Sequence, residues 1–361
     1  MSSRLRLAAA LAVALAVTFA TVGRAGAAIV GPRLAVNVAH IYPNAGTEVR
    51  TMGPTGEGQT RLAGGADLSA PAPIYDTAPA WAPDGKEVAF FGPDGEGPVT
   101  YLVGEDGTHL RELKSMIAPA GPRTFVQEPP VFDPHGNLVG SVFKLLRGHF
   151  DRPAGFDEEG PPVVAVALWS FPTAGGKPHP LGPFKTDRIV VPFSFAPDGT
   201  LLAEEVTRAG PKLGTLDPQG GAIHPVIADP QGLEEPAFSP DGSRIAYLHD
   251  KLGRPNRDEE TKVLASSLMV VPAAGGTPRL VAKVKGGARW PAWDPSGTRL
   301  SFTTLEGGSY AGVLQPRQGN ALIEVNADGT CLTKVLGTKR GTIFGSSWQP
   351  GADRGAGPIA C

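Results

Sequence analysis

A proline-centred motif recurs six times along this chain of 361 residues. In each copy an aromatic residue stands two positions before the proline, and in five copies a glycine stands two positions after it. The six aromatic and proline pairs are Trp81 and Pro83, Phe132 and Pro134, Phe195 and Pro197, Phe238 and Pro240, Trp293 and Pro295, and Trp348 and Pro350. Repetition at intervals of roughly 50 residues is the signature of an architecture built from copies of one supersecondary unit.

Each motif predicts a tight turn between two strands. Proline presets φ for the first corner of a turn, aspartate caps the turn through its side chain, and glycine accepts positive φ. A short apolar run follows the first five turns, as in residues 88–90 and 245–247. A second hairpin follows in each repeat, with Asp-Gly turns at Asp106 and Asp328 as examples. One repeat therefore corresponds to four antiparallel strands.

Six such repeats predict an all-β, six-bladed β-propeller. A sheet of four short strands cannot bury both of its faces alone, and radial packing of several sheets solves this problem. The composition agrees, since 48 glycines and 37 prolines argue against a helical bundle.

The two ends of the chain predict how the ring closes. Pro350 opens a sixth repeat that has only its first strand. Near the N-terminus, residues 33–39, 48–52 and 60–62 supply three strands without a preceding motif. We expect these three strands and the C-terminal strand to form the last blade together, because closure removes the exposed sheet edges that promote aggregation.

The first 27 residues have the pattern of a secretory signal peptide. Arg4 and Arg6 precede an uncharged run over residues 7–22, and the small residues Ala25 and Ala27 form a cleavage site. An uncleaved membrane anchor is the alternative, since the run is just under the usual spanning length. We therefore predict a signal peptide over 1–27, a propeller over 28–350, a tail over 351–361, and a secreted protein, extracellular or periplasmic, without membrane insertion after cleavage.

The charge balance excludes one class of partner. The formal net charge is -2 and the isoelectric point is near 6.4, whereas nucleic-acid binding needs a basic surface. We expect no nucleic-acid partner.

The repeats resemble the TolB-like family of WD40-type (PD40) propeller repeats, whose signature is an aromatic residue, a small residue, Pro-Asp-Gly and an apolar strand. The match covers nearly all of residues 33–350. Pro-Asp-Gly is intact at Pro83, Pro197 and Pro240, and degenerate in the other three repeats. The resemblance implies the propeller fold and protein–protein interaction. The α/β domain that TolB carries before its propeller has no room between residue 28 and the first expected strand.

The expected strand order gives the disc two different faces. Turns between strands 1 and 2 and between strands 3 and 4 share one face, and they are uniformly short. The 2–3 loops and the links between blades share the other face, and the segments 144–162, 250–264 and 303–321 are long. Because long loops are often functional, we predict that the binding surface is the face with the 2–3 loops.

On that face, residues just before the inner strands are expected to ring the mouth of the central channel. The candidates for binding a polar ligand there are Glu128, Glu234, Glu235, Arg289 and Trp290, with the tryptophan as a platform and the arginine as an anion clamp. Structural pairing between neighbouring blades is the competing explanation.

Two further patterns concern the inner strands and metal ions. Strand alternation predicts that the six motif aromatics pack between blades, while their small neighbours face the channel. The small neighbours are Ala80, Val131, Ser194, Ala237, Ala292 and Ser347. Weak candidates for Ca²⁺ ligands are gathered in one long loop, at His149, Asp151, Asp157, Glu158 and Glu159. Their spacing fits no calcium loop, so a solvated acidic loop is favoured and no cofactor is predicted.

The two cysteines, Cys331 and Cys361, predict a disulfide that ties the tail to the fifth repeat. Intermolecular pairing is the alternative. A disulfide suits an oxidising compartment.

Three functions follow from these patterns. The first is a secreted, non-catalytic and monomeric module that binds a protein, a peptide or a cell-envelope polymer. The second is a propeller enzyme of the lactonase, hydrolase or lyase kind, with a metal or polar site at the channel mouth formed by Glu128, Glu234 and Glu235. The third is a structural domain that pairs with its own copy.

Overall fold

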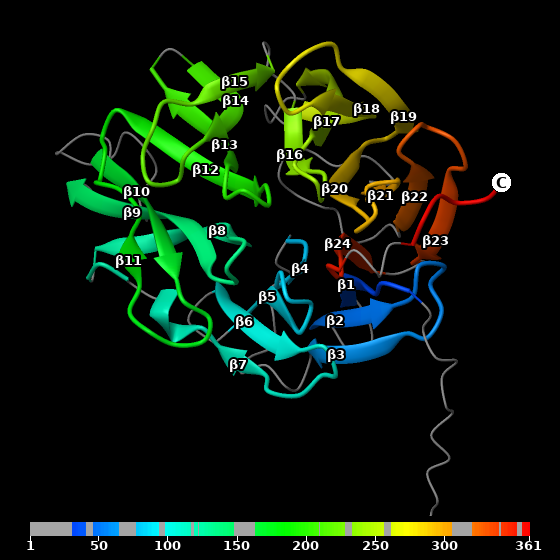
Figure 1. Cartoon of the computed structure of the whole chain (residues 1–361), viewed down its shortest axis with the longest axis horizontal. Coiled ribbons are helices and arrows are strands. Elements are labelled where there is room, and N and C mark those ends of the chain that lie inside the picture. The colour runs from blue at the N-terminus through cyan, green and yellow to red at the C-terminus, as the bar shows by residue number, and fades with distance from the viewer. Residues whose placement is uncertain are drawn as a thin grey trace, which may run out of the picture.

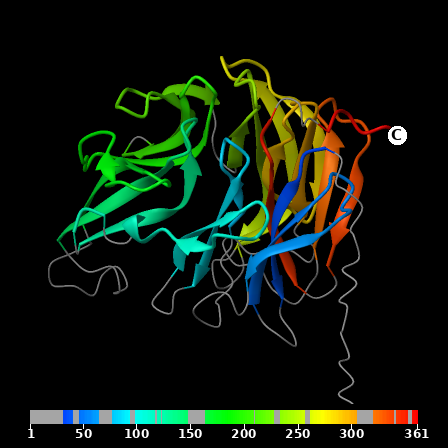
Figure 2. The ribbon, with the colours of Figure 1, turned by 60° about the horizontal axis from the view of Figure 1, so that its bottom comes forward.

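The computed structural model describes residues 31–40, 46–64, 77–93, 98–116, 119–121, 123–147, 163–208, 210–227, 233–255, 261–304, 320–338, 341–351 and 356–361. Six four-stranded antiparallel sheets stand around a central axis (Figure 1). Figure 2 shows their strands running across the thickness of the disc. The predicted six-bladed propeller is confirmed. Within the described residues, no helix has the length and apolar character needed to cross a bilayer.

The blades follow one another along the chain, and strands are given from the axis outward. Blade 1 consists of β4 (Ala80–Trp81), β5 (Glu87–Pro93), β6 (Pro98–Gly104) and β7 (Arg111–Glu112), followed by the 3₁₀ turn η2 (Lys114–Met116). Blade 2 consists of β8 (Thr124–Phe132), β9 (Leu138–Arg147), β10 (Val163–Phe171) and β11 (His179–Pro180). Blade 3 consists of β12 (Arg188–Phe195), β13 (Leu201–Thr207), β14 (Gly210–Leu216) and β15 (His224–Ile227).

The second half of the ring repeats this order. Blade 4 consists of β16 (Leu233–Phe238), β17 (Arg244–Pro255), β18 (Thr261–Pro272) and β19 (Arg279–Lys285). Blade 5 consists of β20 (Ala288–Trp293), β21 (Arg299–Thr304), β22 (Ala321–Asn326) and β23 (Thr333–Gly337). Blade 6 consists of β24 (Thr342–Trp348), β1 (Leu34–His40), β2 (Gly46–Met52) and β3 (Thr60–Gly64).

The motif turns have the predicted local chemistry. In blade 3 the Asp198 carboxylate accepts a hydrogen bond from the Thr200 backbone N–H at 2.9 Å, and Gly199 has φ +88°. In blade 1 Asp84 caps its turn through the Lys86 N–H at 3.0 Å. These side-chain caps hold the first strand antiparallel to the second.

The hydrophobic core is divided among the interfaces between blades. Each of the six clusters of buried apolar residues in the described chain joins two neighbouring blades. One example is the cluster of blades 6 and 1, in which Val49 lies beside Trp81 and Phe90. Each sheet therefore buries its two faces against different partners, as radial packing requires.

Blade 6 closes the ring as predicted. β24 pairs with β1, with Leu34 opposite Trp348 and Ala39 opposite Thr342. The Gln349 side chain continues the seam into blade 1, since its Nε2 donates to the Gly85 carbonyl at 2.7 Å. The first and last parts of the described chain are thereby joined in one sheet.

The C-terminal tail is fastened to blade 5. The predicted disulfide between Cys331 and Cys361 is present, with a Cα–Cα distance of 5.3 Å. The Asn326 side chain holds the tail backbone as well, donating to the Ile359 carbonyl at 2.9 Å and accepting from the Ile359 N–H at 2.6 Å. The cross-link encloses β24, so it constrains the strand that closes the ring.

Loss of the disulfide is expected to destabilise the propeller. In the double variant Cys331→Ser and Cys361→Ser, the unfolded chain gains the freedom of a loop whose ends are 30 residues apart. The chain-entropy relation converts this into a loss of about 3–4 kcal/mol in the free energy of unfolding, measured by urea denaturation. Reduced wild-type protein is the control and is expected to unfold with the double variant. An unchanged midpoint would contradict the role of the cross-link in closure.

Candidate functional site

A cavity lies at the centre of the propeller, where the inner strands run into the motif turns. Its volume is about 750 Å³. All six small residues predicted to face the channel contribute to its wall, namely Ala80, Val131, Ser194, Ala237, Ala292 and Ser347. The turn prolines form its rim, at Pro83, Pro134, Pro197, Pro240, Pro295 and Pro350. We refer to this cavity as the funnel. It opens on the face of the short turns.

The funnel wall follows from strand alternation. The aromatic neighbours of the small residues contribute to the lining, but their rings also pack between blades. Trp81, Phe238, Trp293 and Trp348 are only 5–8% exposed. The predicted core position is confirmed for these four aromatics, whereas Phe132 and Phe195 are half-buried and only partly packed between blades. A cavity of this size is left because side chains as small as alanine and serine point towards the axis.

Two serines of the wall also join neighbouring blades. The Ser194 hydroxyl accepts a hydrogen bond from the Phe238 N–H at 3.0 Å, and the Ser347 hydroxyl accepts one from the Trp81 N–H at 3.2 Å. Both contacts satisfy a backbone donor on the free edge of the next inner strand. The funnel wall is thereby held as one surface across blade boundaries.

Arginines from two blades support the wall from behind. Arg244 of blade 4 lies over the ring of Trp293 in blade 5, at 4.6 Å from the centroid, and donates to the Gly297 carbonyl at 2.8 Å. Arg299 of blade 5 lies over Trp348 of blade 6, at 5.8 Å. Both arginines stand four residues after the motif proline. Such cation–π contacts stabilise the position of each indole.

Arg299 belongs to a buried ion pair next to the funnel. Its Nη1 lies 2.9 Å from Oε2 of Glu324, while its Nε and Nη2 donate to the carbonyls of Gly357 and Ala356 in the tail. Burial raises the pKa of Glu324 to about 7, and the pairing with Arg299 lowers it only in part. Glu324 Oε1 is buried without a hydrogen-bond partner in the described chain.

The two acidic side chains in the funnel lining, Asp133 and Asp241, are engaged in turns. Asp133 accepts hydrogen bonds from the N–H groups of His135 and Asn137 at 2.9 and 2.8 Å. Hydrogen bonds from the hydroxyls of Ser239 and Ser243 lower the pKa of Asp241 to about 2. The Asp241 carboxylate is therefore a poor proton acceptor at neutral pH.

The opposite end of the channel contains the residues that the sequence predicted as a binding site. Glu235 Oε2 accepts a hydrogen bond from the backbone N–H of Trp290, so these two predicted residues are brought together. Glu128 and Glu234 stand in β8 and β16, and their side chains lie outside the described residues. The contact between Glu235 and Trp290 joins blades 4 and 5.

Arg289 is part of a buried network between the same blades. Its Nη1 lies 2.8 Å from Oδ2 of Asp250, whose side chain is fully buried. Asp250 also accepts a hydrogen bond from Ser266, whose hydroxyl accepts from the Ala288 N–H at 2.8 Å. The pairing supports the structural explanation for Arg289, since this charge compensates a buried carboxylate.

Glu235 and Trp290 also share an uncommon backbone conformation. Their φ values are +48° and +54°, and Gly345 at the equivalent place in blade 6 has φ +59°. The pairing of each inner strand with its neighbour shifts register at this point, which is a β-bulge. Positive φ in residues with large side chains stores strain. A side chain at Gly345 would also collide with Trp290, which packs against it.

The weak metal candidates His149, Asp151, Asp157, Glu158 and Glu159 lie outside the described residues. Within the described part of the chain, no group of three or more His, Cys, Asp or Glu side chains is placed to hold a metal ion.

Solved structures with the same fold place the chain among known propellers. The chain is similar to TolB from Acinetobacter baumannii, with a TM-score of 0.59 and 16% identity over 89% of this chain and 67% of that one. The fold is that of a TolB-like propeller. A second similar structure is a putative TolB from Agrobacterium tumefaciens, with a TM-score of 0.52 and 15% identity over 86% of this chain and 91% of that one.

The same fold also occurs in a protein that is not named TolB. Kuenenia stuttgartiensis hydrazine synthase matches with a TM-score of 0.56 and 14% identity, over 92% of this chain and 48% of that one. No protein-family model and no curated protein sequence matches the chain. At these identities the likeness shows the TolB-like propeller fold alone.

Sequence reasoning missed three features of these sites. The funnel opens on the short-turn face, whereas loop length pointed to the other face. The arginine and tryptophan contacts were missed, although arginine recurs at the same repeat position in Arg244 and Arg299. The partner of Arg289, Asp250, could not be found because it lies in another blade, 39 residues away.

Glycine is expected to be better tolerated than alanine at position 290. Trp290→Ala and Trp290→Gly both remove the ring, but only glycine accepts φ +54° without strain. We expect Trp290→Gly to be more stable than Trp290→Ala by about 1 kcal/mol in urea denaturation, against the usual order in strands. The same pair of substitutions at Val325, a buried residue in β22 without positive φ, is the control, where alanine is expected to be better. A more stable alanine variant at position 290 would contradict the assigned backbone strain.

The Glu324 carboxyl is expected to make stability fall as pH rises. Its pKa is about 7 in the folded protein and near 4.5 in the unfolded chain, so the folded state binds the proton more tightly. The free energy of unfolding therefore decreases by about 3 kcal/mol as the pH rises between these two pKa values. Urea denaturation across this range measures the difference between wild type and Glu324→Gln. A difference independent of pH would contradict the raised pKa.

Proposed function

We propose that this protein is a non-catalytic binding module that takes up a segment of a partner protein in the funnel. The observation that carries the proposal is the funnel itself, a cavity of about 750 Å³ walled by small, proline and aromatic residues. Specific binding sites are typically concave and mostly apolar, with few polar groups.

An extended polypeptide segment suits this wall. An apolar side chain fits between the small residues at the axis. The backbone of the segment meets the prolines and the turn backbone at the rim. The TolB-like fold supports a protein partner, as the sequence resemblance implied.

The lining supports binding rather than catalysis. Asp133 and Asp241 are the acidic side chains among the funnel residues, and hydrogen bonds within the turns occupy both. The enzyme alternative relied on Glu128, Glu234 and Glu235 at the other end of the channel. It stays a prediction, and stoichiometric metal in the purified protein would favour it.

We also propose that the protein is exported and works as a monomer. The signal-like pattern over residues 1–27 supports export, and so does the disulfide between Cys331 and Cys361, since disulfides persist in oxidising compartments. Closure of the ring by β24 supports a monomer, because among the described strands blade 6 is completed by strands of the same chain.

Blocking the funnel is expected to remove partner binding. Ala237→Trp places an indole in the funnel without changing the rim. The measurement is a pull-down from an extract of the source cell envelope, read by quantitative mass spectrometry. We expect the amount of each polypeptide that wild-type protein retains to fall at least tenfold with Ala237→Trp.

The matched control addresses the face predicted from loop length. A variant in which a short Gly-Ser linker replaces residues 149–161 is expected to retain the same polypeptides as wild type. If the loop variant no longer retains these polypeptides and Ala237→Trp still does, the binding site lies on the opposite face. If wild-type protein retains no polypeptide in a larger amount than the support without protein does, the proposal is contradicted. Unfolding midpoints of both variants show whether the fold is kept.

A further inference from the structure

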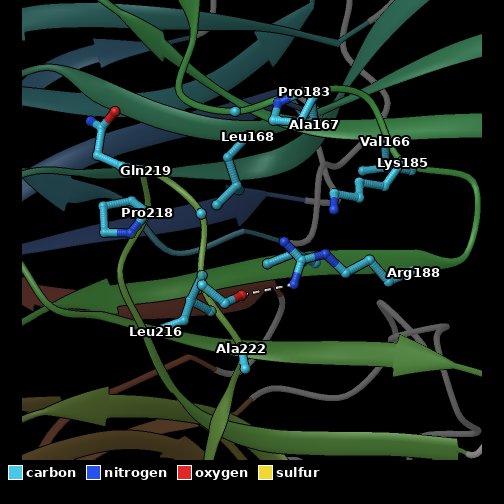
Figure 3. Close-up of a pocket in the computed structure, with 14 residues that line it drawn as sticks. Val166, Ala167, Leu168, Pro183, Lys185, Arg188, Leu216, Pro218, Gln219 and Ala222 are labelled. Atoms are coloured by element: carbon cyan, nitrogen blue, oxygen red, sulfur yellow. Dashed lines mark hydrogen bonds between the residues drawn. The ribbon is translucent and has the colours of Figure 1, made fainter.

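A second cavity lies between blades 2 and 3, away from the residues of the funnel. Its volume is about 470 Å³, and we refer to it as the inter-blade cavity. Its wall comes from β10, from the segment between β11 and β12, from β12 itself, and from the turn between β14 and β15. The view in Figure 3 looks into it.

The cavity exists because the outer strand of blade 2 is interrupted. β11 has only two residues, and Leu181 still donates to the Leu168 carbonyl at 2.8 Å. Four residues later Lys185 pairs with Val166 on β10, in both directions, at 2.7 and 2.9 Å. The intervening chain, which includes Pro183, leaves the sheet edge. Because proline has no N–H, it cannot continue the ladder.

Two cations extend into this space. In Figure 3 the side chains of Lys185 and Arg188 run in the same direction, and their charged ends lie on the same side of the cavity. Arg188 Nη1 pairs with Glu205 at 2.9 Å and donates to the Gly221 carbonyl at 3.0 Å. Within the described chain, its Nε and Nη2 and the Lys185 ammonium have no hydrogen-bond partner. No lining residue is acidic.

The remaining wall is apolar and its lip is backbone. Leu168, Val190 and Leu216 are buried residues whose surfaces face the cavity. At Gly220 an added Cβ would meet nothing within 4 Å, so this part of the lip is open. A ligand for such a cavity needs an apolar body and an anionic end.

The charges select the kind of anion. Lys185 and Arg188 contribute two positive charges, and Glu205 compensates one, so one positive charge is left for a ligand. Asp187 and Asp217 are nearby in sequence, but they do not line the cavity. A monoanion matches this balance better than a dianionic phosphate. The free Nε and Nη2 of a guanidinium also present the parallel donors that a carboxylate accepts.

We propose that the inter-blade cavity binds a monocarboxylate with an apolar body, through Lys185 and Arg188. The source of the carboxylate is either a free organic acid or the C-terminus of a peptide, and both share this chemistry. The site is independent of the funnel, so it stands or falls separately from the proposed partner binding.

The test uses the full mature protein and ¹⁹F NMR. The probe is 4-(trifluoromethyl)phenylacetate, and its neutral primary amide is the matched compound. We expect the carboxylate to bind at least tenfold more tightly than the amide. We also expect inorganic phosphate, added at the same concentration as the carboxylate probe, not to displace the probe. Equal affinity for acid and amide, or displacement by phosphate, would overturn the proposal.

Three variants locate the site. Lys185→Gln is expected to weaken carboxylate binding about five- to tenfold and to leave amide binding unchanged. Gly182→Leu fills the mouth, where an added Cβ lies 3.7 Å from the Gln219 carbonyl, and is expected to abolish binding of both compounds. Lys177→Gln removes an exposed lysine of the same blade outside the cavity and is expected to change nothing. Wild-type affinity in Lys185→Gln and Gly182→Leu would place the probe elsewhere and overturn the proposal.

A second arm distinguishes the two sources. A hexapeptide that ends in Leu-Phe is offered as competitor with a free or an amidated C-terminus. Displacement of the probe by the free acid alone assigns the site to peptide C-termini. Failure of both peptides assigns it to free organic acids. Displacement by both peptides to the same extent would overturn recognition of a carboxylate. Thermal unfolding of each variant shows that its fold is intact.

Discussion

The structure depends on the fact that each four-stranded sheet has two apolar faces and can cover neither by itself. The six hydrophobic clusters of the described chain all lie between neighbouring blades, so every blade is stabilised by two others. Such an arrangement is complete only when the last sheet meets the first. The pairing of β24 with β1 is therefore the contact on which the rest of the fold relies, and the disulfide and the tail contacts of Asn326 reinforce that region.

The same radial packing creates the funnel. Aromatic side chains of the inner strands fill the wedge between blades, and their neighbours must be small because six strands converge on one axis. The resulting cavity is large, and its wall is mostly apolar with few reactive side chains. Charged groups near it, such as Arg244, Arg299 and Glu324, act from behind the aromatic layer and hold it in place. Binding by shape and apolar contact fits this construction.

Much of the fold could be predicted from the repeat. The motif prolines and glycines marked the turns, the alternation of Ala237 with Phe238 marked the faces of an inner strand, and the lone motif at Pro350 marked the closing strand. The candidate site was predicted less well. The sequence predicted Arg289 and Trp290 as residues of the channel mouth but not their contacts with Asp250 and Glu235, which come from the neighbouring blade. The inter-blade cavity arises from an interrupted outer strand of blade 2, which the repeat pattern did not predict.

The sequence by itself determined the number of blades, the position of the turns and the closure of the ring. Each of these depends on local turn chemistry, on strand alternation, or on a count of repeats. Only the tertiary structure decided which face holds a cavity, which charges are compensated, and where two blades leave space between them. These properties depend on distances between residues far apart in the chain, such as Arg188 and Gly221, and no local pattern encodes such distances.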